Sequence, residues 1–263
     1  MTENTPSLWR HLLPRPATDG HKYDRGHAVV LAADELTGAT RLAATACSRM
    51  GAGLVTVISP ARADFFRAVL PPDIMVRGRF DPAMRGITAV LAGPGGGDAA
   101  AQLPDMAEPF FRILDAGALP EAGNYETIDA MTVLTPHDGE FSRAFPDATG
   151  ERTERALAAA RACGGIVVLK GAETVIAAPD GQLAVNRHAS PFLAKAGTGD
   201  VLAGMICGLL AQCDPVTREA MFEMVCAAVW MHGEAGIRLG PGLTASDLEN
   251  ALPGILRDLY GKT

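Results

Sequence analysis

Short apolar segments alternate with segments of helical periodicity along most of this chain, and this alternation is the strongest constraint on its fold. Residues 28–32 and 54–58 read as buried strands, and between them apolar side chains recur every three or four positions over residues 39–50. Such a strand, helix and strand unit places two parallel strands side by side under a covering helix. Its repetition predicts a largely parallel sheet covered by helices.

Further apolar or β-branched runs extend the predicted sheet. The runs expected to form strands are residues 74–76, 89–92, 112–114, 132–134, 166–169 and 174–177. The expected helices span residues 151–163, 201–212 and 215–239, with a final helix opened by residues 244–247. Residues 1–20 are expected to form an irregular arm, and residues 21–263 a single domain. Ligands bind beyond the carboxyl ends of parallel strands, so the turns after strands are where functional residues are expected.

Composition and charge narrow the functional classes. Lys and Arg total 23 against 30 Asp and Glu, a net charge of −7 without any basic run, so no nucleic-acid partner is expected. No segment reads as a membrane span or a signal peptide, and five cysteines lack metal-binding spacing, which predicts a cytoplasmic protein with reduced thiols. An acidic protein that binds a phosphorylated molecule must concentrate positive potential locally, through backbone N–H groups, lysines or a metal ion.

The strongest local signal for a binding site is the sequence AGTGD at residues 196–200, directly before an apolar helix. Its glycines permit a tight turn, which leaves N–H groups at the positive end of the helix free to bind phosphate oxygens. The residues expected to form this anion hole are Ala196, Gly197, Thr198 and Gly199. A carboxylate beside bound phosphate is unfavourable unless a proton must be removed there, so Asp200 is the predicted general base. By itself such a turn more often only caps a helix, and the assignment depends on its neighbours.

Three other turns follow predicted strands and carry suitable residues. Lys170 directly follows the strand expected at residues 166–169 and could contact nucleotide phosphates. In the sequence LTPHDGE at residues 134–140, His137 could contact a substrate and Glu140 could hold a Mg²⁺ ion. The glycines of residues 93–97 would let the backbone approach a ligand. Each segment alone is compatible with a plain surface turn, but the position after a strand favours function.

Together these segments resemble the NAD(P)H-hydrate dehydratases, a ribokinase-like family. The resemblance covers nearly all of residues 21–259. It includes GPG at residues 93–95, VLKG at 168–171 and GTGDVLAG at 197–204, in that order. The resemblance implies a ribokinase-like three-layer α/β/α fold with a largely parallel central sheet. It also implies a hydro-lyase that uses a nucleotide to convert (6S)-NADHX or NADPHX to NADH or NADPH, without the epimerase domain to which the family is often fused.

The resemblance further implies roles for individual residues. The residues implied to line the hydrated dinucleotide are Ala39, Gly95, His137 and Asp200. The residues implied to hold the adenine nucleotide are Lys170, Gly171, Ala172, Glu173, Thr174 and Gly199. Mg²⁺ is the implied cofactor, and ADP (or ATP) the co-substrate, with ADP favoured because the compact chain looks bacterial. The family resemblance also favours a homo-oligomer, in particular a tetramer.

Four positions in three segments depart from the family pattern. Lys195 and Ala196 stand where the family usually has Thr-Gly, and Asp138 stands in place of a proline. Gly117 replaces the second acid of a frequent Asp-Ala-Asp sequence, so Asp115 alone remains a candidate there.

Two alternative functions remain open from the sequence. The first is a ribokinase-like kinase acting on an alcohol of a vitamin precursor, since the GTGD sequence is shared. The second is a nucleotide-binding regulator without catalysis, for which the departures at Gly117 and Ala196 are the only hints. A phosphorylated product would indicate the kinase, and binding without turnover the regulator.

Overall fold

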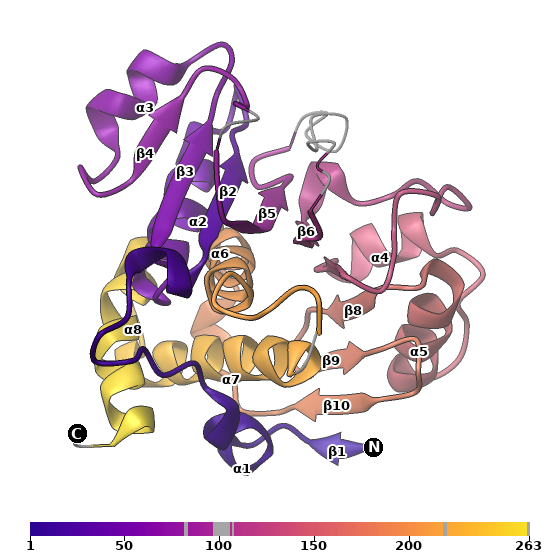
Figure 1. The fold of residues 1–263 in the computed structure, drawn as a ribbon. Helices are drawn as coiled ribbons and strands as arrows, with labels where there is room; N and C mark the ends of the chain where they lie inside the picture. The colour runs from indigo at the N-terminus through magenta and orange to yellow at the C-terminus, as the bar shows by residue number, and fades with distance from the viewer. Residues whose placement is uncertain (82–83, 97–105, 107, 218–219, 262–263) are drawn as a thin grey trace.

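A ten-stranded sheet runs through the centre of the structure (Figure 1), in the order β1-β10-β9-β8-β7-β6-β5-β2-β3-β4. The computed structural model describes residues 1–81, 84–96, 106, 108–217 and 220–261. The strands are β1 (Thr2–Glu3), β2 (His27–Leu31), β3 (Leu54–Ile58), β4 (Met75–Arg77), β5 (Ile87–Ala92), β6 (Phe111–Leu114), β7 (Thr132–Leu134), β8 (Ile166–Leu169), β9 (Thr174–Ala177) and β10 (Leu183–Asn186). From β2 to β8 every pairing is parallel, so the carboxyl ends of these strands share one edge.

Helices cover both faces of the sheet, which confirms the predicted three-layer fold. The helices are α1 (Pro6–Trp9), α2 (Thr37–Arg49), α3 (Ala63–Val69), α4 (Asp138–Ala144), α5 (Arg152–Cys163), α6 (Thr198–Leu210), α7 (Met221–Leu239) and α8 (Ala245–Tyr260). Side chains of a strand alternate between the two faces. Val30 of β2 accordingly packs in the core beneath α2, α6, α7 and α8, whereas Val29 packs in the core beneath α4 and α5. Among the described residues no helix is long and apolar enough to cross a membrane.

Glycines allow α6 to lie directly on α2. A Cβ atom on Gly204 would lie 2.2 Å from the carbonyl oxygen of Ala43, and one on Gly208 would lie 2.4 Å from that of Cys47. Larger residues would separate the two helices, because such distances are shorter than any real van der Waals contact. The close packing fixes α6 against the sheet and thereby fixes the position of its first turn.

The structure differs from the sequence-based expectation at the amino terminus. The segment 1–20 was expected to be irregular, but β1 pairs in parallel with β10 and α1 follows it. Trp9 is fully buried, and its indole Nε1 donates to Asn4 Oδ1 at 3.0 Å. A two-residue strand and a four-residue helix are too short to show periodicity, which explains the error. The division into an arm and a single domain stays a prediction.

Other boundaries also differ from expectation. Strand β10 and the helices α3 and α4 were not predicted, because four to seven residues carry too little periodicity. Helix α7 begins at Met221 rather than at residue 215, after Ala220 adopts a left-handed conformation at φ 61°. The strands expected at residues 166–169 and 174–177 are confirmed as β8 and β9, and they pair in antiparallel fashion.

Candidate active site

The turns that follow three neighbouring strands lie side by side at the carboxyl edge of the parallel strands. Asp115 follows β6, His137 lies just beyond β7 and Lys170 follows β8, and these strands are neighbours in the sheet. An isolated parallel bridge joins His137 to Lys170. The Lys170 N–H also donates to the carbonyl oxygen of Pro136 at 2.9 Å. The backbone therefore holds the second and third turns together as one unit.

Ala39 and Gly95 meet where the strand order reverses. The chain runs from β2 outward to β3 and β4, then returns to β5 on the other side of β2. A Cβ atom on Gly95, at φ +88°, would lie 3.1 Å from Ala39 Cβ and 2.8 Å from the Leu36 carbonyl oxygen. Only glycine fits this close approach. Ligands of parallel α/β sheets bind at such a reversal point, as expected for these two residues. Gly97, the end of the predicted glycine loop, lies outside the described residues.

The first turn of α6 presents free hydrogen-bond donors. Gly197 takes a left-handed conformation at φ 92°, and the Thr198 hydroxyl donates to carbonyl oxygens of the preceding turn at 2.8 and 2.9 Å. The N–H groups of Gly199 and Asp200 have no hydrogen-bond acceptor in the described part of the chain. These two N–H groups lie at the positive end of the helix, and their binding of an anion stays a prediction. Ala196 is an exposed part of the same turn.

His232 of α7 supports this turn and was not predicted. Its Nε2 lies 2.9 Å from the carbonyl oxygen of Thr198. Burial lowers the pKa of His232 to about 4, with nearby Lys170 acting in the same direction. The imidazole is therefore neutral at pH 7, and its Nε2 carries the proton that it donates, because a carbonyl can only accept. In the sequence His232 stands among apolar residues of a helix, a pattern that gives no sign of this contact.

Two carboxylates lie within 4.0 Å of the Lys170 ammonium group, and that of Asp200 interacts with it electrostatically. Lys170 Nζ lies 2.9 Å from Asp115 Oδ1 and 4.0 Å from Glu140 Oε2, and the Asp115 side chain is almost fully buried. A Cβ atom on Gly199 would lie 3.3 Å from Lys170 Nζ, so the ammonium lies against the first turn of α6. The structure thus brings Lys170 and Gly199 together, and their binding of a nucleotide stays a prediction.

The third carboxylate, Asp200, has a perturbed acidity. Burial, followed by the charges of Asp115 and Glu140, raises its pKa from 3.8 to about 6, against the opposing charge of Lys170. The side chain is half-buried and lies in the first turn of α6. A carboxyl group that titrates near neutral pH can both accept and release a proton under physiological conditions. This acidity suits the general base predicted at this position.

His137 and Glu140 hold the start of α4. His137 Nδ1 accepts hydrogen bonds from the N–H groups of Gly139 and Glu140 at 3.0 and 3.3 Å. Glu140 Oε2 accepts the His137 N–H at 2.8 Å, which completes a reciprocal cap. The imidazole is largely exposed and remains open to a ligand at the site. Among the described residues no group of three or more His, Cys, Asp or Glu is arranged to hold a metal ion.

The turn between β8 and β9 contains the other residues predicted to hold the nucleotide. Ala172 and Glu173 are exposed, and Glu173 Oε1 accepts from Arg187 Nε at 2.7 Å. The Thr174 hydroxyl donates to the carbonyl oxygen of Gly171 at 3.2 Å, within the turn itself. Two side chains of this turn therefore have partners inside the protein. Their contact with a nucleotide stays a prediction.

Two of the positions that depart from the family pattern form contacts of their own. Asp138 Oδ1 accepts from Arg152 NH1 at 2.7 Å, a partner that sequence reasoning missed. Lys195 Nζ donates to the carbonyl oxygen of Leu243 at 2.7 Å. Gly117 lies in a short 3₁₀ turn directly after Asp115 and adds no side chain to the site.

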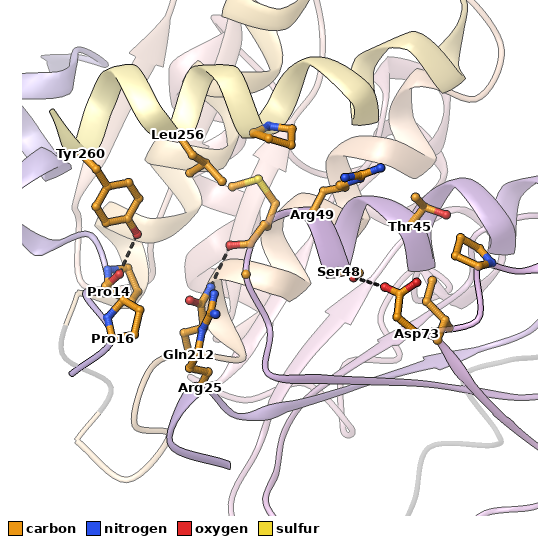
Figure 2. A pocket seen from close by; sticks show the side chains of 15 residues that line it. Pro14, Pro16, Arg25, Thr45, Ser48, Arg49, Asp73, Gln212, Leu256 and Tyr260 are labelled. Atoms are coloured by element: carbon orange, nitrogen blue, oxygen red, sulfur yellow. Dashed lines mark hydrogen bonds between the residues drawn. The ribbon is translucent and has the colours of Figure 1, made fainter. Parts of the chain in front are cut away.

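A separate pocket of about 530 Å³ lies at the far end of α6 (Figure 2). It is lined in part by Arg49 and Met50 at the end of α2 and by Gln212 just after α6. Gln212 Nε2 donates to the Met50 carbonyl oxygen at 2.9 Å, and Tyr260 donates to that of Pro14 at 2.6 Å. None of the residues predicted for the active site lines this pocket.

Comparison with known sequences gives consistent matches. A family model described as NAD(P)H-hydrate dehydratase matches residues 28–253. A Neisseria meningitidis protein named ADP-dependent (S)-NAD(P)H-hydrate dehydratase is 35% identical, with 96% of this chain and 90% of that protein covered. A Xanthomonas campestris protein of the same name is 32% identical, with 92% of each covered. The chain spans about half the length of the bifunctional NAD(P)H-hydrate repair enzymes that it also matches, such as that of Synechocystis, which is 34% identical with 46% of its length covered.

Comparison with solved structures agrees with the sequence matches. The ADP/ATP-dependent NAD(P)H-hydrate dehydratase of Bacillus subtilis, co-crystallised with ATP and Mg²⁺, has a TM-score of 0.84 at 30% identity, with 98% of both chains covered. Arabidopsis thaliana ribokinase has a TM-score of 0.55 at 12% identity, covering 88% of this chain and 98% of that chain. The second likeness concerns the fold alone and confirms the ribokinase-like architecture.

Proposed function

Because the chain belongs to the NAD(P)H-hydrate dehydratase family, we propose that it converts (6S)-NADHX and NADPHX to NADH and NADPH in an ADP-dependent reaction. The observation that carries this proposal is the raised pKa of Asp200 beside the free N–H groups of the same helix turn. A base for a hydroxyl proton and a site for a phosphoryl group therefore adjoin one another. The kinase alternative is not favoured, because the likeness to ribokinase is limited to the fold.

The chemistry of the substrate explains the need for a nucleotide. The hydrate carries a hydroxyl at C6 of the reduced nicotinamide ring, and hydroxide is a poor leaving group at neutral pH. Asp200 accepts the hydroxyl proton while the oxygen attacks the terminal phosphorus of ADP, and AMP leaves. The C6–O bond of the resulting phosphate ester then breaks, and phosphate leaves, pushed by the lone pair of the ring nitrogen. Loss of a C5 proton restores the double bond, so the products are NAD(P)H, AMP and phosphate.

The two ligands occupy adjoining parts of the site in this proposal. Ala39, Gly95, His137 and Asp200 line the hydrated dinucleotide, supported by the close approach of Ala39 and Gly95 at the strand reversal. Lys170, residues 171–174 and Gly199 hold the adenine nucleotide. The position of the Lys170 ammonium against the first turn of α6 supports this assignment. The free N–H groups of that turn stabilise the negative charge of the transferring phosphoryl group.

Mg²⁺ is part of the proposal, with Glu140 as a ligand. Mg²⁺ generally takes one or two carboxylates and completes its shell with phosphate oxygens and water. Glu140 supplies one carboxylate next to the proposed phosphate site. The other ligands of the ion would be phosphate oxygens of the bound nucleotide and water. Bound there, the ion would neutralise phosphate charge close to the carboxylates of Asp115, Glu140 and Asp200.

One assay tests the proposed function directly. The protein is incubated with hydrated NADH, Mg²⁺ and either ADP or ATP, and the absorbance of the dihydronicotinamide ring is followed together with phosphate release. Recovery of absorbance with stoichiometric phosphate is the expected result, faster with ADP. A stable phosphorylated product without recovered absorbance would identify a kinase, and absence of both signals would refute the dehydratase proposal.

We further propose a cytoplasmic location and a homotetrameric assembly. All five cysteines are free thiols, as expected for a reducing compartment. The assembly follows from the family resemblance, and light scattering over a range of protein concentrations tests it. A monomer at every concentration would refute the tetramer.

A further inference from the structure

Arg152 joins the two turns that carry His137 and Lys170. Its guanidinium donates from NH1 to Asp138 Oδ1 at 2.7 Å and from Nε to the Glu173 carbonyl oxygen at 2.9 Å. NH2 donates to the carbonyl oxygens of Leu169 and Lys170 at 3.2 and 2.6 Å. A single side chain thus bonds to the turn after β7 and, three times, to the turn after β8.

The position of Arg152 is unfavourable for its own helix. Arg152 is the first residue of α5, where the partial positive charge of the helix favours an acid rather than a cation. Glu151 and Glu154 already cap this helix end. The stability of α5 therefore gives no reason for an arginine, whereas the planar fork of donors matches the cluster of carbonyl oxygens beside it.

The contacts of Arg152 fix the backbone of Lys170 and the adjoining glycine. Carbonyl and N–H of a trans peptide point in opposite directions. Holding the Leu169 and Lys170 carbonyls toward Arg152 therefore turns the N–H groups of Lys170 and Gly171 to the other side, where they donate to the Pro136 carbonyl oxygen at 2.9 Å and to the Thr174 hydroxyl at 3.4 Å. A Cβ atom on Gly171 would lie 2.4 Å from Arg152 NH2, so glycine is required for this contact. The backbone fixed in this way sets where the Lys170 ammonium lies against Gly199.

We propose that Arg152, together with Asp138, is a positioning residue for the nucleotide, an inference that rests on the proposed function. Arg152 binds three carbonyl oxygens at the end of β8 and in the turn after it, and thereby keeps the Lys170 ammonium against the first turn of α6. Asp138 occupies the position where the family usually has proline, so this chain adds a side-chain bond between the two turns. The pair acts on nucleotide affinity rather than on the proton transfer at Asp200.

The test compares Arg152→Gln and Arg152→Lys with Arg155→Gln. Arg155 lies on the same helix and bonds to Ala148 and Ser142, away from both turns, so it is a matched control. The Kd for ADP is measured by calorimetry, and KM and kcat are measured with hydrated NADH. Both Arg152 variants are expected to weaken ADP binding at least about tenfold and to leave the KM for hydrated NADH within about twofold, because small displacements of positioning groups are costly. Lysine fails to rescue because it lacks the fork of donors.

If Arg152→Gln folds poorly, a milder variant still tests the role of the Arg152–Asp138 pair. Asp138→Asn removes only the charge-assisted bond and is expected to weaken ADP binding by about two- to fivefold in a folded protein. Wild-type ADP affinity in the Arg152 variants, or an equal loss in Arg155→Gln, would overturn the inference. Wild-type protein that binds ADP without dehydrating the hydrate would refute the proposed function alone, since the Kd comparison would still decide the role of Arg152. Absence of ADP binding in the wild type would overturn both.

Discussion

Replacing Asp200 with asparagine is expected to raise the stability of the protein at pH 7 while removing its turnover. Burial, followed by the charges of Asp115 and Glu140, raises the pKa of Asp200 from 3.8 to about 6. The folded carboxyl group therefore binds its proton more tightly than the unfolded one, and its ionisation destabilises the fold. The free-energy cost of ionising Asp200 in the folded protein is absent below about pH 4, grows as the pH rises, and is fully present above about pH 6.

The size of the stability gain follows from the difference between the folded and the unfolded pKa of Asp200. From 3.8 to about 6 is about two pKa units, which corresponds to about 3 kcal/mol at about 1.4 kcal/mol per unit. Because the Asp200 side chain is only half-buried, solvent screening reduces the expected gain in the free energy of unfolding to about 1–2 kcal/mol. Asparagine cannot accept the substrate proton, so kcat/KM is expected to fall at least ~10²-fold.

Urea unfolding at pH 4 and pH 7, together with the hydrate assay, measures both effects. The stability gain of Asp200→Asn is expected at pH 7 and should vanish at pH 4. Asp180→Asn is the control, because hydrogen bonds from Gln182 lower the pKa of Asp180 and its replacement should bring no gain. A gain of equal size at both pH values would refute the electrostatic reasoning, and unimpaired turnover would exclude Asp200 as the base.

Two further predictions concern neighbouring charge and helix packing. Asp115→Asn removes the charged group that most raises the pKa of Asp200, so the acid limb of kcat/KM against pH is expected to move to lower pH; an unchanged midpoint would contradict the coupling. Gly204→Ala would place a Cβ atom 2.2 Å from the Ala43 carbonyl oxygen, and a loss of about 1–3 kcal/mol is expected in urea unfolding. Gly254→Ala, where an added Cβ meets nothing within 4 Å, is expected to gain up to about 1 kcal/mol. Equal losses at both glycines would argue against close helix packing as the cause.

The contact between Lys170 and Asp115 could not be predicted from the sequence. Each residue could be placed after a strand from the apolar run that precedes it. The two are 55 positions apart, so their bond depends on the order of β6, β7 and β8 in the sheet. The same holds for His232, whose contact with Thr198 spans 34 positions and two helices. Local patterns do not encode such contacts, which explains why the partners were missed.

Arg152 illustrates a weaker signal that the sequence did contain. An arginine at the first position of a helix is electrostatically unfavourable, and this conflict could have marked the residue for attention. Its four partners, however, are three backbone carbonyls and one carboxylate from two different turns. Only the folded chain reveals that arrangement.

The sequence by itself determined the elements whose signal is local. The glycine turn before α6, the apolar strands and the lysine that follows β8 are each written in a few consecutive residues, because period and turn chemistry act over short distances. The tertiary structure alone decided the acidity of Asp200, because its pKa depends on burial and on charges that arrive from β6, α4 and the end of β8. Electrostatic energies depend on distances in space, and sequence separation carries almost no information about those distances.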